Sequence, residues 1–174
     1  MSSITITTGR FNNETWNICK LYREKNNISC IYSPPYKLSA SIELNSPVFI
    51  IEMNNSTNKI LGIGLIKNKL VTDKIYKVQK DTNCNRYIYI GNHHISRELL
   101  EFYNPLLVNI LDEILFKGYT HSKRGSGITK IPEKVLTLEI CKNINIKHEI
   151  KTIFINHYKN HYKNTKKYNK KDFN

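Results

Sequence analysis

Hydrophobic residues in the first half of the chain occur in short alternating or continuous runs, which are typical of β-strands. Two of these runs, Val48–Met53 and Lys59–Lys67, flank the polar segment 54–58, and this arrangement predicts a β-hairpin. Gly62 and Gly64 in its second strand predict a bulge, a sharp bend or a close approach of another part of the chain. Strands are predicted at Ile4–Thr8, Ser29–Ser33, Val48–Met53, Lys59–Lys67, Lys74–Gln79 and Arg86–Ile90.

Helical spacing of apolar residues dominates the second half, and residues suited to helix N-caps precede several runs. Asn12 or Asn13 caps an early helix, Ser96 caps another, and Asn104 precedes a proline suited to a first helical turn. Helices are predicted at Glu14–Lys25, Arg97–Tyr103, Leu106–Leu115 with a stop at Gly118, after Pro132, and from Ile146 to Tyr162. This order indicates an α+β fold, with a mainly antiparallel sheet or small β-barrel flanked by helices and a helical C-terminal part.

Lysine and arginine outnumber acidic residues, and the excess is partly concentrated at the C-terminal end. The formal net charge is +13 over 174 residues. We expect one globular domain over residues 1–163 and a disordered, basic tail rich in Lys and Asn over residues 164–174. A strongly basic chain favours an anionic partner such as nucleic acid. Abundant Ile, Lys and Asn also fit the codon bias of an A/T-rich genome.

Several classes of protein do not fit these patterns. The apolar runs are too short to span a bilayer, and the first residues lack the apolar block of a signal peptide. The four cysteines have none of the short spacings that structural zinc sites favour. We therefore expect a soluble protein of the reducing cytoplasm, or of the nucleus, with free thiols, no metal, no cofactor and no membrane partner.

The segment 117–130 has the highest density of side chains suited to chemistry. It combines glycines with hydroxyl groups, one imidazole and several cations, and such a loop can bring backbone N–H groups and charges to a phosphate. It lacks the spacing of a Walker loop. A solvated loop between two helices is the alternative. The candidate contacts to phosphate or RNA backbone are Lys117, His121, Lys123, Arg124 and Lys130.

Aromatic and small polar residues gather around the early strands, where stacking could hold a nucleobase. Glu52 follows an apolar run, and its carboxylate is either paired and buried or able to accept from the edge of a guanine. Core packing is the alternative for the aromatic residues, and turn formation is the alternative for Asn54. The candidate nucleotide pocket consists of Trp16, Tyr32, Ser33, Tyr36, Glu52 and Asn54, with Tyr87 and Tyr89 nearby in the sequence.

The hairpin and one preceding strand also resemble a known superfamily. The run Lys59-Ile60-Leu61-Gly62-Ile63-Gly64, and Cys30-Ile31-Tyr32-Ser33 before it, are similar to the PUA-like superfamily, in particular its EVE and YTH branches, over about residues 28–92. The resemblance implies binding of RNA or modified nucleotides in an aromatic cage beside a basic groove. It places Tyr32, Ser33 and Trp16 in the cage and Lys123 and Arg124 in the groove. YTH cages contain more than one tryptophan, whereas this chain has only Trp16.

The sequence is compatible with three functions. The first is a non-enzymatic module that binds single-stranded RNA and reads a methylated base, an mRNA cap or another terminal nucleotide. The second is a small nucleic-acid-processing enzyme in which His121 acts with Lys123 or Arg124. The third is a protein-interaction domain whose charge reflects codon bias.

Overall fold

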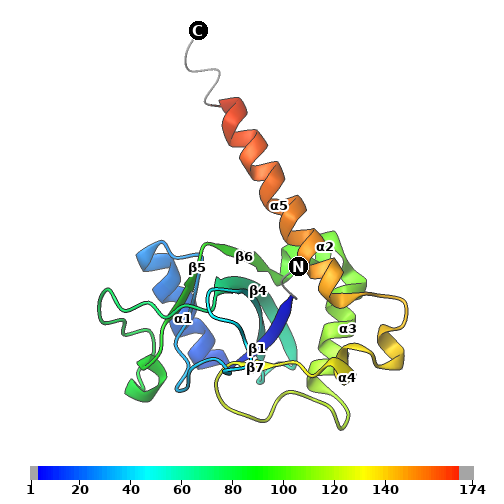
Figure 1. Cartoon of the computed structure of the whole chain (residues 1–174), viewed down its shortest axis with the longest axis horizontal. Coiled ribbons are helices and arrows are strands. Elements are labelled where there is room, and N and C mark those ends of the chain that lie inside the picture. Colours follow the sequence, from blue (N-terminus) through cyan, green and yellow to red (C-terminus); the bar gives the residue numbers. More distant parts are fainter. Residues whose placement is uncertain (1–3, 169–174) are drawn as a thin grey trace.

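A computed structural model describes the backbone of residues 4–168 and the side chains of residues 4–160 (Figure 1). The strands are β1 (Thr5–Phe11), β2 (Cys30–Tyr32), β3 (Pro47–Asn54), β4 (Lys59–Lys67), β5 (Tyr89–Gly91), β6 (His93–Ser96) and β7 (Thr129–Lys130). The helices are α1 (Asn13–Asn26), α2 (Arg97–Tyr103), α3 (Pro105–Phe116), α4 (Glu133–Leu136) and α5 (Ile146–Tyr168), with short 3₁₀ turns η1 (Thr82–Asn85) and η2 (Glu139–Cys141). The predicted α+β class is confirmed.

The strands form two sheets within the described part of the chain. The larger sheet has the order β6-β4-β3-β1-β7, and the smaller one pairs β2 with β5. β1 runs parallel to β3, while the other pairings are antiparallel. The predicted hairpin is therefore confirmed, and so is a mainly antiparallel arrangement. The alternative of a small closed barrel is wrong, because β6 and β7 are the two edges of the larger sheet.

One predicted strand pair is absent from the structure. Residues 74–79 form no strand. Of the second predicted run only Tyr89 and Ile90 pair, and their partner is β2 rather than residues 74–79. The amide of Asn85 explains the difference. Its Oδ1 accepts from the backbone N–H groups of Val78 and Gln79, and its Nδ2 donates to the Gln79 carbonyl. These bonds satisfy the backbone without a neighbouring strand.

Local capping signals set the helices as predicted. The Asn12 side chain accepts from the Thr15 N–H, and the Thr15 hydroxyl accepts from the Asn12 N–H, which completes a capping box at the start of α1. The side chains of Ser96 and Asn104 cap α2 and α3 by accepting from the N–H groups of Leu99 and Leu107. Among the described residues no helix is long and apolar enough to cross a membrane.

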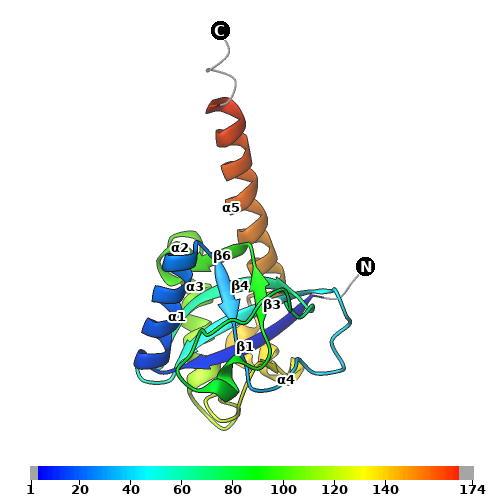
Figure 2. The same ribbon diagram turned by 90° about the vertical axis from the view of Figure 1, so that its left-hand side faces the viewer.

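The largest group of buried apolar side chains lies between the five-stranded sheet and the helices α2, α3 and α5. On its other side the sheet is covered by β2, β5 and α1, with two smaller apolar clusters (Figure 2). The two views show α5 leaving the body of the molecule beyond its packed N-terminal half. The backbone of α5 is helical to Tyr168, so residues 164–168 of the predicted disordered tail continue the helix, and residues 169–174 lie outside the described part.

Candidate functional site

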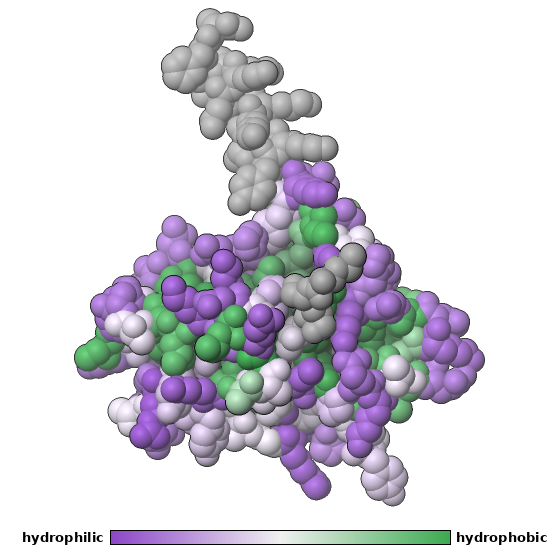
Figure 3. All heavy atoms as spheres, viewed as in Figure 1, coloured by the Kyte–Doolittle hydropathy of each residue, from purple (hydrophilic) through white to green (hydrophobic). Residues whose placement is uncertain are grey.

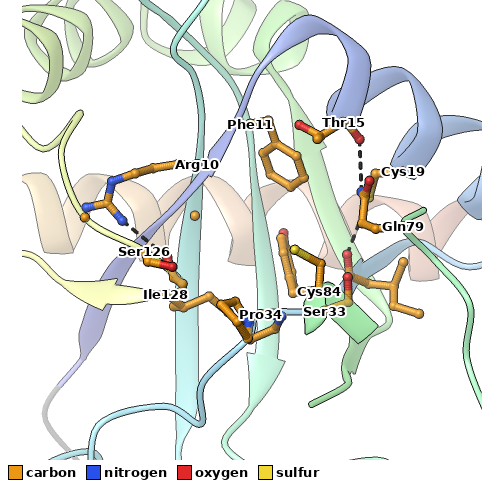
Figure 4. Close-up of a pocket in the computed structure, with 16 residues that line it drawn as sticks. Arg10, Phe11, Thr15, Cys19, Ser33, Pro34, Gln79, Cys84, Ser126 and Ile128 are labelled. Atoms are coloured by element: carbon orange, nitrogen blue, oxygen red, sulfur yellow. Dashed lines mark hydrogen bonds between the residues drawn. The ribbon is translucent and has the colours of Figure 1, made fainter. Parts of the chain in front are cut away.

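A cavity of about 240 Å³ opens beside the N-terminal turns of α1, and we call it cavity A. Figure 4 shows the labelled side chains arranged around it. Five separate parts of the chain contribute: the end of β1, the start of α1, the end of β2, the segment around η1 and the loop before β7. The lining residues are Gly9, Arg10, Phe11, Thr15, Cys19, Ile31, Tyr32, Ser33, Pro34, Pro35, Gln79, Cys84, Gly125, Ser126, Gly127 and Ile128.

The polar groups of cavity A are mostly uncharged. Ser33 forms no side-chain hydrogen bond among the described residues, and Gln79 uses its Nε2 to donate to the Thr15 carbonyl at 3.1 Å while its Oε1 has no described partner. Burial raises the pKa of the Cys19 thiol to about 11 and also raises that of Cys84, so both stay protonated near neutral pH. The cavity therefore offers neutral donors and acceptors on a largely apolar wall.

Arg10 fixes the basic loop at the mouth of cavity A. Its guanidinium donates to the carbonyls of Ser122 and Gly127 and to the hydroxyl of Thr129. Asn55, in the turn of the hairpin, also donates to the loop at the Lys123 carbonyl. The loop that carries the candidate phosphate contacts is thus attached at several points to the strand that lines the cavity.

Below cavity A lies a buried hydrogen-bonded network centred on Glu52, whose side chain is fully buried. Its Oε1 accepts from the Tyr32 hydroxyl at 2.8 Å and from Arg23 at 2.7 Å, and its Oε2 lies 2.9 Å from Nε2 of His94. Burial opposes ionisation of Glu52, but the charges and hydrogen bonds of Arg23 and His94 outweigh it and lower its pKa to about 2. Glu52 is therefore a carboxylate that positions Tyr32 in the wall of the cavity.

The two glycines of β4 make room for this network. A Cβ at Gly64 would lie 1.9 Å from the Tyr32 hydroxyl, and one at Gly62 would lie 2.7 Å from the Ile95 carbonyl and 3.1 Å from Oε2 of Glu52. The register between β3 and β4 also shifts next to Glu52. The bulge and the close approach predicted for these glycines are both confirmed, and the buried tyrosine is the group that approaches.

The structure brings only part of the predicted pocket together. Tyr32 and Ser33 line cavity A, whereas Tyr36 is 64% exposed and lies outside it, beside Gly127. Glu52 is engaged by its three partners and does not line the cavity.

Trp16 and Asn54 lie elsewhere. Trp16 lines a second depression of about 450 Å³ between α1 and the β6–α2 segment, which we call groove B. Its ring makes an edge-to-face contact with Phe11, with 5.2 Å between the ring centroids, and the Arg23 guanidinium carbon lies 5.1 Å from its centroid. Asn54 bonds to Asn13 and to the Ser56 N–H, which is the turn-forming alternative.

The predicted phosphate contacts lie on or beside the loop at the mouth of cavity A. Arg124 is exposed and Lys123 is half-buried, both directly before the glycines that line the cavity. Lys130 is exposed on β7. His121 uses Nδ1 to accept from the Lys123 N–H, and Lys117 pairs with Glu113 on α3.

Sequence reasoning missed most of the cavity wall, including Arg10, Phe11, Thr15, Cys19 and Gln79. A weak signal exists for two of them, because Thr15 and Cys19 are four apart on α1 and so share one helix face. No three His, Cys, Asp or Glu side chains of the described residues are grouped as metal ligands would be. No protein-family model matches the chain, and no curated protein has a significantly similar sequence.

Proposed function

We propose that the chain is a non-enzymatic RNA-binding module that reads a single modified or terminal nucleotide. The observation that carries the proposal is a small cavity, lined by apolar and neutral polar groups apart from the Arg10 guanidinium, whose mouth is formed by a basic loop. Cavity A is smaller than the roughly 300–1,000 Å³ of pockets for drug-sized molecules, which suits one ring system rather than a larger ligand. In this proposal the base enters cavity A and the loop 117–130 contacts the flanking phosphates.

The chemistry of the wall favours a neutral base over a cationic one. No carboxylate lines cavity A among the described residues, and Glu52, which bonds the lining residue Tyr32, is already engaged by three groups. A positively charged 7-methylguanine would lack a counter-charge there, whereas an uncharged N-methylated base places its methyl group on apolar surface. The unpaired Ser33 hydroxyl and the Oε1 of Gln79 supply hydrogen bonds that distinguish one base edge from another.

The test is fluorescence anisotropy with short single-stranded RNAs that are unmodified, contain N6-methyladenosine or carry a 7-methylguanosine cap, with matched DNA, at several salt concentrations. We expect one modified RNA to bind most tightly and to keep its advantage at high salt. Ser126→Leu narrows the cavity and should remove this advantage, while Ser41→Leu, also at an exposed loop serine, should leave it unchanged. Equal binding of all RNAs that disappears with salt would refute the proposal.

The loop is tested separately. The double variant Lys123→Ala and Arg124→Ala should weaken the binding of all the RNAs by a similar factor. It should also reduce the slope of log K against log salt concentration by about 0.7 for each lost phosphate contact. The matched control replaces the exposed lysines 25 and 59, which lie outside cavity A and the loop. A change in the discrimination between bases without a change in the salt slope would contradict the proposal that cavity A recognises the base and the loop contacts the phosphates.

One observation keeps an enzymatic alternative open at a different histidine. Glu52 hydrogen-bonds Nε2 of His94, and the His94 ring lines groove B. The carboxylate fixes the orientation of the ring, and Nδ1 can then act as a general base. His121 has no such carboxylate among the described residues. RNA cleavage that is lost in His94→Gln and kept in His121→Ala would favour this alternative over the binding module.

A further inference from the structure

A third depression lies far from cavity A, between α5 and the opposite end of the sheet, and we call it groove C. It has a volume of about 440 Å³. Ile4, Phe49 and Leu65 contribute from the sheet side, and Phe154, Ile155 and Tyr158 contribute from α5. In Figure 3, apolar surface lies at the foot of α5 beside hydrophilic side chains.

The floor of groove C is rigid. The ring of Phe154 packs edge-on against Phe49 with 5.0 Å between centroids, and the Tyr158 hydroxyl bonds to both the backbone N–H and carbonyl of His94. Ile155 is different, because it remains 38% exposed although it lies in the groove wall. An apolar surface whose side chains are held in place, with an isoleucine exposed on it, favours binding of another apolar surface.

The rim of groove C carries charge of one sign. Lys151 and Lys159 stand on α5 at either side of Ile155, and neither pairs with an acid of the described residues. None of the described residues that line the groove is acidic. The two lysines are eight positions apart on the helix, which places them about 12 Å apart along the helix axis.

We propose that groove C docks an acidic amphipathic helix of a partner protein. Such a helix presents apolar side chains at three- and four-residue spacing over a length similar to that between the lysines, with carboxylates beside them. The pair of cations distinguishes this occupant from a fatty acid, whose single carboxylate would engage one lysine. A phosphate would reach only the two rim lysines and would leave the apolar floor uncovered, and the +13 net charge opposes a second copy of the chain.

Groove C and cavity A can be occupied together. Cavity A is lined by residues 9–11 at the end of β1, whereas Ile4 precedes that strand. Five residues of strand correspond to about 17 Å. The docking proposal is therefore independent of the proposed RNA reading, and a partner bound at groove C would leave the base cavity open.

The test uses a synthetic helical peptide with leucines at every third or fourth position and glutamates beside them, and a control peptide with lysines in place of the glutamates. Anisotropy with the full chain at physiological salt should show binding of the acidic peptide only. The double variant Lys151→Glu and Lys159→Glu should lower the affinity for the acidic peptide at least tenfold and allow the basic peptide to bind. Lys25→Glu with Lys59→Glu, which changes the total charge equally, should weaken the acidic peptide less than threefold.

The apolar contact has its own matched pair of variants. Ile155→Ser should weaken the acidic peptide at least fivefold, whereas Ile140→Ser, at an isoleucine 47% exposed on η2, should not. Failure of the acidic peptide to bind, or equal losses in the two lysine pairs, would overturn the proposal. So would competition by single-stranded RNA, or self-association in sedimentation that Ile155→Ser abolishes, since these identify RNA or a second copy as the occupant.

Discussion

Replacing Gly64 with alanine should strongly destabilise the fold because the new methyl group collides with a tyrosine that has no room to move. The Cβ would lie 1.9 Å from the Tyr32 hydroxyl, against 3.4–4 Å for ordinary contacts, so the hydroxyl must shift by about 1.5 Å. Tyr32 is only 3% exposed, and its hydrogen bond to Glu52 is 2.8 Å long. A shift of that size breaks the bond.

The expected cost has two parts. Overpacking of a close-packed site costs about 1–3 kcal/mol. Loss of a buried hydrogen bond to a charged group costs about 1.5–3 kcal/mol. Together they lower the free energy of unfolding by about 2.5–6 kcal/mol, a large share of the roughly 5–15 kcal/mol typical of folded domains.

Urea unfolding followed by circular dichroism measures this change, with unchanged dependence on urea concentration as the sign of a pure stability effect. Gly9→Ala is the matched control, because its Cβ would meet Ile50 Cγ2 at 3.3 Å and Phe11 Cε2 at 4.0 Å, so the cost should stay below about 1 kcal/mol. Gly64→Ala should also cost at least about 1 kcal/mol less in a Tyr32→Phe background, where the colliding hydroxyl is gone. Equal costs in the two backgrounds would refute the collision as the cause.

Three further outcomes follow from the described contacts. Because Glu52 has a pKa of about 2 in the fold and 4.5 as its ordinary value, its ionisation stabilises the protein above pH 4.5, and up to about 3 kcal/mol is lost as the pH falls towards 2. Urea titrations across that range should show this loss, and Glu52→Gln should flatten it. Arg10→Met should release the loop it bonds, so trypsin should cut after Lys123 several-fold faster, while Lys130→Met should not change that rate. Cys19, which is 1% exposed, should resist iodoacetamide at pH 8 until urea unfolds the chain, and mass spectrometry should find the half-buried Cys84 modified first.

Local signals in the sequence were sufficient for most of the elements. Asn12, Ser96 and Asn104 each cap the helix that was predicted after them, and the polar turn at 54–58 joins the predicted hairpin. These signals act within a few residues, so they need no knowledge of distant parts of the chain. The strand predicted at 74–79 does not form, and here too a local contact is the cause. The side chain of Asn85 provides the hydrogen bonds that a neighbouring strand would have made.

The candidate site was only partly predictable. Tyr32 and Ser33 were found because an aromatic and a small polar residue end a short strand, and the loop with Lys123 and Arg124 was found by its composition. Trp16 was assigned to the same pocket, but α1 turns it to groove B, one position away from the face that carries Thr15. The helix face decides this, and a change of one residue rotates a side chain by about 100°.

Periodicity, caps and turn residues act over short distances, and they were enough to predict the helices, the central hairpin, the α+β class and the basic loop. Three features depend on the packed chain: β1 pairs in parallel with β3, Arg10 holds a loop more than one hundred residues away, and Glu52 meets Tyr32, Arg23 and His94. Those contacts depend on sheet register and on the burial of distant apolar segments against one another. Both are properties of the whole packed chain, and no short window of residues contains them.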